Sequence, residues 1–175
     1  MRFPTAVAVL SLAARAAAPR ALEAQEPRNN VIYGELLGNG GASSINYERR
    51  IGSTHLRVGY GSWSSGDLFG AGSTSYKTFP FTISKVRGNG NHRLEAGGGL
   101  TIGSRSFSSS FGSRSDEDSS FQTITGIAGY RYQKPDGALV FRAVLTPLYG
   151  LGDLDTAYPD KGFFMSLGVS LGIAF

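Results

Sequence analysis

The final segment of the chain alternates between large apolar residues and small residues. Apolar side chains occupy Phe163, Met165, Leu167, Val169, Leu171, Ile173 and Phe175, and serine, glycine or alanine occupies each even position from 166 to 174. A period of two residues is that of a β-strand, because successive side chains of a strand point to opposite faces. The pattern therefore predicts a strand over 162–175 with one apolar face and one face of small residues.

Seven earlier segments have strand-like patterns, and no window after residue 30 shows a sustained helical period. They are 30–37, 43–50, 55–63, 75–86, 93–103, 121–132 and 138–148. Tilted strands of about 9 to 11 residues span a bilayer, and strands with apolar residues outside and small or polar residues inside are typical of transmembrane barrels. The fold class predicted is all-β, an eight-stranded antiparallel up-and-down transmembrane β-barrel. Pro80 lacks a ladder donor, so a bulge or bend is expected beside it.

The connections between these strands alternate in length. Those after the second, fourth and sixth strands are short, at 51–54, 87–92 and 133–137, and those after the third, fifth and seventh are longer, at 63–74, 104–120 and 149–161. Outer-membrane barrels have short periplasmic turns and longer external loops. The alternation therefore predicts both termini and three short turns in the periplasm, with three long loops outside and a tight first connection at 38–42.

The beginning of the chain is ordered like a secretory signal. Arg2 precedes the apolar run 6–14, and mostly small residues follow to position 24. We expect 1–25 to be a signal peptide and 26–175 to be the outer-membrane barrel domain. Arg15 and Arg20 follow the apolar run and no clear cleavage motif is present, so an alanine-rich soluble helix or a tail remains the alternative.

Composition narrows the choice of function. Charged residues make up 17% of the 175 residues, against about 25% in typical soluble domains. Cysteine is absent, which excludes disulfides, thiolate zinc sites and cysteine nucleophiles. The basic residues are scattered along the chain, so nucleic acid is not an expected partner despite the net charge of +4.

Charged residues also occur at positions expected to face the barrel interior. The candidates for an interior charge network are Glu35, Glu48, Arg57, Glu95 and Arg142. An eight-stranded barrel is just wide enough to be filled by side chains, and buried charges need partners. We predict that these residues plug the barrel, with a proton relay or ligand site as the alternative. His55 and His92 are expected to be exposed turn residues.

Aromatic residues near the predicted strand ends are expected to form interfacial girdles. They are Trp63, Tyr76, Tyr149 and Phe163 at the long-loop end, and Tyr130, Tyr132 and Phe175 at the other. The serine-rich segment 104–120 contains Asp116, Glu117 and Asp118, and it is expected to be mobile and solvated. A divalent ion that bridges lipopolysaccharide, or an external partner, is the alternative for its acidic run.

Three segments, 126–133, 141–148 and 168–175, resemble small bacterial outer-membrane β-barrel proteins of the OmpA/OmpX type. The resemblance covers nearly the whole mature chain. It implies that Phe175, a final aromatic residue after alternating apolar positions, is the signal read by the barrel assembly machinery. It also implies outer-membrane lipid and lipopolysaccharide as surroundings. These segments indicate an architecture rather than a chemistry.

No catalytic, cofactor or metal constellation is recognised in the sequence, so no enzyme activity and no cofactor are expected. The leading hypothesis is a structural or surface-interaction outer-membrane protein that acts through its external loops. Two alternatives remain. One is a soluble periplasmic lipocalin-like binding protein, and the other is a membrane-embedded lipid-modifying enzyme.

Overall fold

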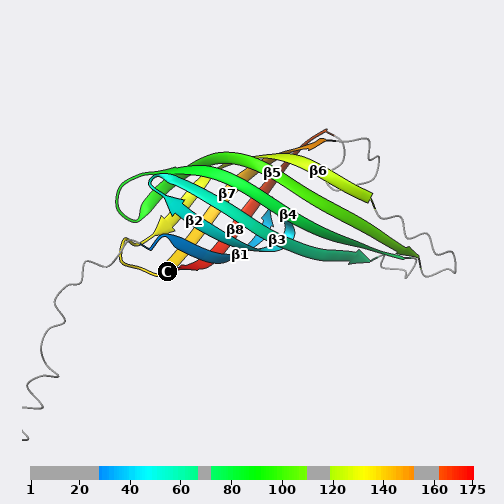
Figure 1. Cartoon of the computed structure of the whole chain (residues 1–175), viewed down its shortest axis with the longest axis horizontal. Helices are drawn as coiled ribbons and strands as arrows, with labels where there is room; N and C mark the ends of the chain where they lie inside the picture. Colours follow the sequence, from blue (N-terminus) through cyan, green and yellow to red (C-terminus); the bar gives the residue numbers. More distant parts are fainter. Residues whose placement is uncertain (1–27, 67–71, 110–118, 152–161) are drawn as a thin grey trace, which may run out of the picture.

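Eight consecutive strands close into a barrel (Figure 1). The computed structural model describes residues 28–66, 72–109, 119–151 and 162–175. Each strand pairs antiparallel with the next, and β1 also pairs with β8, which closes the sheet. The strands are β1 (Asn30–Gly38), β2 (Gly41–Ile51), β3 (Thr54–Gly66), β4 (Gly72–Arg87), β5 (His92–Ser109), β6 (Ser119–Gln133), β7 (Leu139–Leu151) and β8 (Gly162–Ala174). The predicted fold class is confirmed.

The two ends of the barrel differ. The turns at 52–53, 88–91 and 134–138 and the carboxyl terminus share one end, called here the short-turn end (Figure 1). At the opposite long-strand end, β4 and β5 continue to the pair Gly72 and Ser109. Parts of the predicted loops 63–74 and 104–120 are therefore strands. Strand pairing uses backbone N–H and C=O groups, so polar side chains do not prevent it. The predicted signal and the acidic run lie outside the described residues.

The outer surface of the barrel is apolar. On β8 and at the following Phe175, the odd positions from Phe163 onward are 41% or more exposed, whereas Gly168, Ser170, Gly172 and Ala174 are buried. Among the described residues, eighteen buried side chains are polar or charged and nine are hydrophobic. This distribution is the reverse of that in a water-soluble domain and is that of a barrel with a lipid-facing surface. The described residues include no helix of sufficient length and apolarity to cross a membrane.

Proline interrupts the ladder without changing its register. The β3–β4 pairs Val58↔Phe81 and Gly61↔Thr78 flank Pro80 in one continuous register, with no ladder pairs between them. A similar gap lies between β6 and β7 beside Pro147. No residue is inserted, so a bulge at Pro80 is wrong, but the expected departure from regular hydrogen bonding is found: β4 loses local pairs with β3 because proline has no N–H to donate.

Candidate functional site

The centre of the barrel is filled by an arginine held between two carboxylates. Arg142 of β7 is fully buried, and its Nε and Nη2 donate to the two carboxylate oxygens of Glu95 on β5, at 2.8 and 3.0 Å. Its Nη1 donates to Oε2 of Glu35 on β1 at 3.3 Å. Ser170 of β8 donates to the same Glu35 oxygen at 3.0 Å. The two-point contact with Glu95 fixes the guanidinium plane as well as its position.

A second arginine joins the same carboxylates from the other wall. Arg57 of β3 donates from Nη2 to Oε1 of Glu95 at 3.0 Å, and its Nη1 lies 3.5 Å from Oε2 of Glu35. The guanidinium carbons of Arg57 and Arg142 lie 5.4 and 5.0 Å from the centre of the Tyr33 ring. Both distances are within the range of a cation–π contact. The Tyr33 ring therefore contributes an electrostatic attraction to both guanidinium groups.

Nearer the short-turn end, Glu48 of β2 accepts hydrogen bonds from a second group of side chains. Its Oε1 accepts from Nη1 of Arg131 at 2.5 Å and from Nδ1 of His55 at 2.8 Å. Arg131 of β6 also donates to Oε1 of Gln133 from Nε and Nη2, at 3.2 and 3.1 Å. The other Glu48 oxygen lies 3.9 Å from Nε of Arg57, which links this set to the central one.

The structure brings all five sequence-predicted interior residues together. Each is on the inner face, is 3% exposed or less, and belongs to the same connected set of ion pairs. The sequence analysis missed Arg131. With Arg131 included, the set contains three guanidinium groups and three carboxylates. The period-two pattern of the sixth strand could have found it, because Arg131 shares a face with Thr123, Thr125 and Ile127. A balanced set of this kind packs the interior and carries no net charge.

The expected exposure of His55 is wrong. His55 is 3% exposed, and it points inward two positions before Arg57 on the same strand. Its place near a turn suggested a surface residue, but its strand parity decides its direction. His92 is exposed as expected, with its Nδ1 2.6 Å from the hydroxyl of Tyr130.

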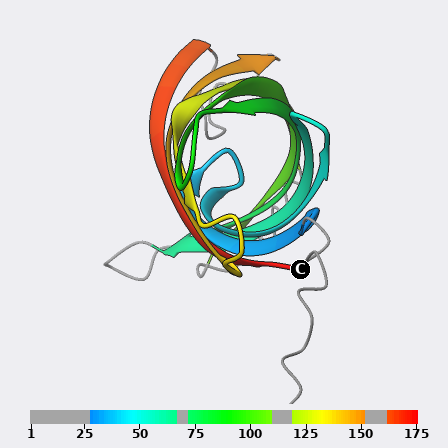
Figure 2. The ribbon, with the colours of Figure 1, turned by 90° about the vertical axis from the view of Figure 1, so that its left-hand side faces the viewer.

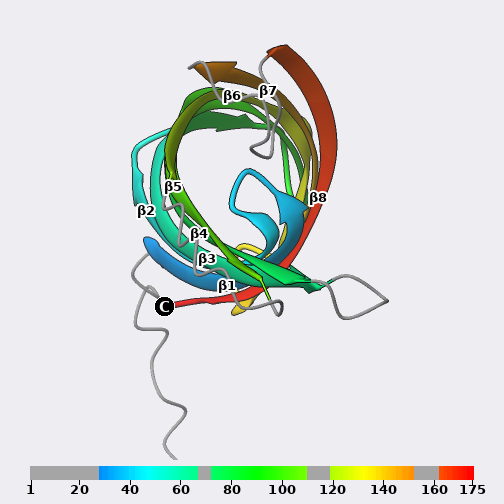
Figure 3. The ribbon, with the colours of Figure 1, turned by 90° about the vertical axis from the view of Figure 1, so that its right-hand side faces the viewer.

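The connection between β1 and β2 folds into the barrel (Figures 2 and 3). The carbonyl of Asn39 accepts from the Thr101 hydroxyl at 3.0 Å, and the carbonyl of Gly40 accepts from the Thr78 hydroxyl at 2.7 Å. Asn39 is 5% exposed. The tight first connection predicted from the sequence therefore narrows the lumen at the long-strand end.

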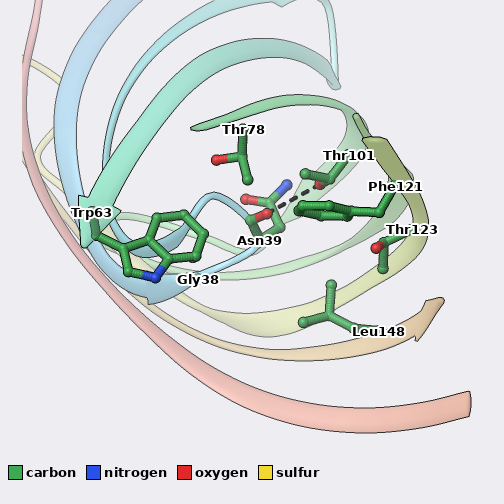
Figure 4. Close-up of a pocket in the computed structure, with 9 residues that line it drawn as sticks. Gly38, Asn39, Trp63, Thr78, Thr101, Phe121, Thr123 and Leu148 are labelled. Atoms are coloured by element: carbon green, nitrogen blue, oxygen red, sulfur yellow. Dashed lines mark hydrogen bonds between the residues drawn. The ribbon is translucent and has the colours of Figure 1, made fainter. Parts of the chain in front are cut away.

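A small pocket lies above this turn (Figure 4). Its walls include Trp63, Phe121 and Leu148, and its volume of about 10 Å³ is close to that of a single water site. Both side-chain polar atoms of Asn39 and the Thr123 hydroxyl are buried without a hydrogen-bond partner among the described residues. These atoms fit a bound water better than a large ligand, because the volume is small.

Trp63 and Tyr76 face the opening of the barrel at the long-strand end, called here the mouth, rather than the lipid. Their expected place in an outer girdle is therefore wrong. Their rings stack at 5.0 Å with an interplanar angle of 8°. Side chains alternate in direction along a strand. Trp63 lies six residues after the buried Arg57 on β3, and Tyr76 lies two residues before the buried Thr78 on β4, so both point inward. Tyr149 and Phe163 do lie on the outer surface, 52% and 69% exposed.

Gly41 lets the inward turn pass beneath Trp63. It has φ +93°, and a Cβ at this position would lie 2.1 Å from the indole ring. We predict that Gly41→Ala destabilises the barrel by about 1–3 kcal/mol and changes the emission of Trp63, the single tryptophan. Urea unfolding followed by tryptophan fluorescence measures both effects.

Gly52→Ala is the matched control for that prediction. Gly52 has φ +62°, and a Cβ there would meet nothing within 4 Å. The Gly52→Ala substitution therefore introduces the strain of a positive φ without a clash against the indole ring. Native Trp63 emission in Gly41→Ala, or equal losses of stability in both variants, would contradict the proposed packing of the turn.

The arrangement favours packing over catalysis. Within the described ranges, no group of three or more histidine or acidic side chains could hold a metal ion. The interior carboxylates are engaged by guanidinium groups, and His55 is bound to Glu48. The site is a connected set of buried ion pairs, and the inward turn between β1 and β2 narrows the lumen above it.

A closed eight-stranded barrel with an apolar exterior and a filled, charged interior has the architecture of the small outer-membrane barrels. Three solved structures are similar to it. The N-terminal β-barrel domain of OprF from Pseudomonas aeruginosa has a TM-score of 0.59 at 18% identity, covering 86% of this chain and 100% of that chain. Neisserial surface protein A has a TM-score of 0.57 at 12% identity, covering 84% and 94%.

The third structure is Ail, the attachment invasion locus protein of Yersinia pestis, in complex with the heparin analogue sucrose octasulfate. Its TM-score is 0.51 at 16% identity, covering 83% of this chain and 96% of that chain. No protein-family model and no curated protein sequence matches the chain. At these identities the similarity establishes the fold, and it confirms the predicted resemblance at that level.

Proposed function

We propose that the protein is an outer-membrane barrel with a structural or surface-interaction role at its long-strand end. The observation that carries the proposal is the combination of an apolar exterior with an interior closed by ion pairs and an inward turn. A plugged interior disfavours transport, which leaves the long connections between strands for contact with partners. In this proposal residues 1–25 direct export, and the short-turn end faces the periplasm.

The charge of the long connections favours one kind of external partner. Segments 67–71, 110–118 and 152–161 together contain seven acidic residues and two basic ones. Ail was crystallised with a polysulfated sugar, but a polyanion would be repelled by this excess of acidic residues. We therefore propose that these connections bind cations, supplied either by a basic partner surface or by divalent ions that bridge Asp116, Glu117 and Asp118 to lipopolysaccharide phosphates.

The carboxyl terminus supports the proposed assembly role of Phe175. Its side chain is 56% exposed on the outer surface. Its backbone N–H donates to the carbonyl of Asn30 at 2.9 Å, and its own carbonyl accepts from the N–H of Asn30 at 3.1 Å. The last residue thus lies at the closing seam between β8 and β1, where an assembly factor could reach it.

The full chain, expressed in a Gram-negative host and extracted from membranes, tests the proposal. We expect its mobility on a detergent gel to change on boiling, because a closed barrel resists detergent until heated, and we expect no stable channel in planar bilayers. A soluble periplasmic protein without a mobility shift would contradict the membrane location. A large stable conductance from the heat-modifiable form would contradict the plugged interior.

A further inference from the structure

Cations gather at the short-turn end of the barrel. They are Arg28, Arg49, Arg50, Lys85, Arg87, Arg93 and Lys134. Among the residues that the structure describes at this end, Asp136 is the sole acidic side chain outside the barrel interior. This distribution was not apparent from the sequence, in which the same residues are spread over more than a hundred positions. The fold therefore concentrates positive charge at one rim.

Part of this rim forms a groove at the edge of the barrel, where the outward-facing Leu94 adjoins Arg93, which lies on the same strand face as the inward-facing Glu95. It is an open cavity of about 530 Å³, lined by Arg87, Gly88, His92, Arg93, Leu94 and Tyr130. In the sheet Leu94 of β5 pairs with Arg87 of β4 on one side and with Tyr130 of β6 on the other. Leu94 is 70% exposed, the highest exposure among the large apolar residues described. The groove thus joins the apolar surface of the barrel to the cationic rim.

The arginines of the groove have no carboxylate partner among the residues that the structure describes. No ion pair between described residues involves Arg87 or Arg93. Nε of Arg93 donates to the carbonyl of Gly90 at 3.4 Å, and Arg93 lies within electrostatic reach of Arg50 and Arg131. An anion placed here would relieve this repulsion and satisfy the open guanidinium donors.

The turn between β4 and β5 joins the two strand ends that carry Arg87 and Arg93, and both residues line the groove. Gly88 has φ +143°, and a Cβ there would lie 2.6 Å from the carbonyl oxygen of His92. Glycine is therefore needed for the close approach of the two strand ends.

We propose that this groove binds an anionic phospholipid. The phosphate lies between the guanidinium groups of Arg87 and Arg93, and an acyl chain runs along Leu94 onto the apolar wall. A headgroup anion satisfies the cations, and the chain covers exposed apolar surface, so one molecule matches both parts of the groove. The inference rests on the proposed membrane location, with the short-turn end in the periplasmic leaflet.

Native mass spectrometry of the full-length protein folded in detergent tests the site, with phosphatidylglycerol and phosphatidylcholine as probes. We expect the double variant R87Q/R93Q to bind phosphatidylglycerol about 30-fold more weakly, equivalent to about 2 kcal/mol, and to bind phosphatidylcholine unchanged. The matched control is R49Q/K85Q, which removes two exposed cations from the same rim outside the groove.

Three results would overturn the inference: unchanged phosphatidylglycerol binding by R87Q/R93Q, equal weakening in R49Q/K85Q, or equal binding of glycerol 3-phosphate, which lacks the acyl chains. The gel-mobility assay on the same samples separates this failure from that of the proposed function. A heat-modifiable wild type without a preference for phosphatidylglycerol contradicts the lipid site alone. A wild type without the mobility shift contradicts the membrane location and the lipid site together.

Discussion

Replacing Arg142 with glutamine is expected to destabilise the barrel by about 3–5 kcal/mol. Arg142 is fully buried and is hydrogen-bonded to both Glu95 oxygens and to Glu35. Glutamine is shorter than arginine and carries no charge, so it cannot replace these contacts. The carboxylates of Glu95 and Glu35 then lose the positive charge that they share inside the barrel. Urea unfolding of protein folded in lipid vesicles, followed by the fluorescence of Trp63, measures the loss.

Two variants control for the chemistry of this change. Arg49→Gln removes the same charge from an exposed position, and we expect it to change stability by less than about 0.5 kcal/mol. E95Q/R142Q removes an acid together with its partner, so its cost should fall below the sum of the single variants by about 0.5–3 kcal/mol. Equal stabilities of the Arg142 and Arg49 variants would show that the interior ion pairs do not support the fold.

Leu167→Arg tests the other half of the architecture, the apolar exterior. Leu167 lies midway along β8, is 55% exposed, and pairs with Leu145 on the same outer surface. In a bilayer an arginine at this depth costs about 2–4 kcal/mol, because its charge enters hydrocarbon. We expect this loss in vesicle-reconstituted protein, measured by the same urea titration.

Leu151→Arg is the matched control for membrane depth. Leu151 is 40% exposed and ends β7 at the long-strand end, where the cost should fall to about 0–1 kcal/mol. On a soluble lipocalin-like barrel both substitutions would lie on a water-facing surface and cost within about 0.5 kcal/mol. Equal effects at the two positions would therefore favour the soluble alternative.

The local pattern of the chain was sufficient to predict the eight strands and their two faces, though not the full length of β4 and β5. The alternation from Phe163 to Phe175 identified the outer surface of β8, and Glu95 and Arg142 were assigned inward by parity alone. Parity is a property of one strand and needs no partner. Where it was not applied, at His55 and Arg131, the prediction was wrong or incomplete.

Other features depend on which strands become neighbours. The continuation of β4 and β5 to Gly72 and Ser109 required a partner backbone, because their polar residues show little strand pattern by themselves. The inward turn depends on Thr78 and Thr101 from strands distant in sequence. The gap beside Pro80 likewise depends on what faces it across the ladder.

The amino-acid sequence by itself determined an all-β chain of eight two-faced strands, with small or charged residues on one face and apolar residues on the other. Only the tertiary structure decided which charges meet, how the first turn closes the lumen, and where Arg87, Arg93 and Leu94 form a groove. The physical reason is that side-chain direction follows from neighbouring residues along one strand, whereas ion pairs and grooves follow from the register between strands.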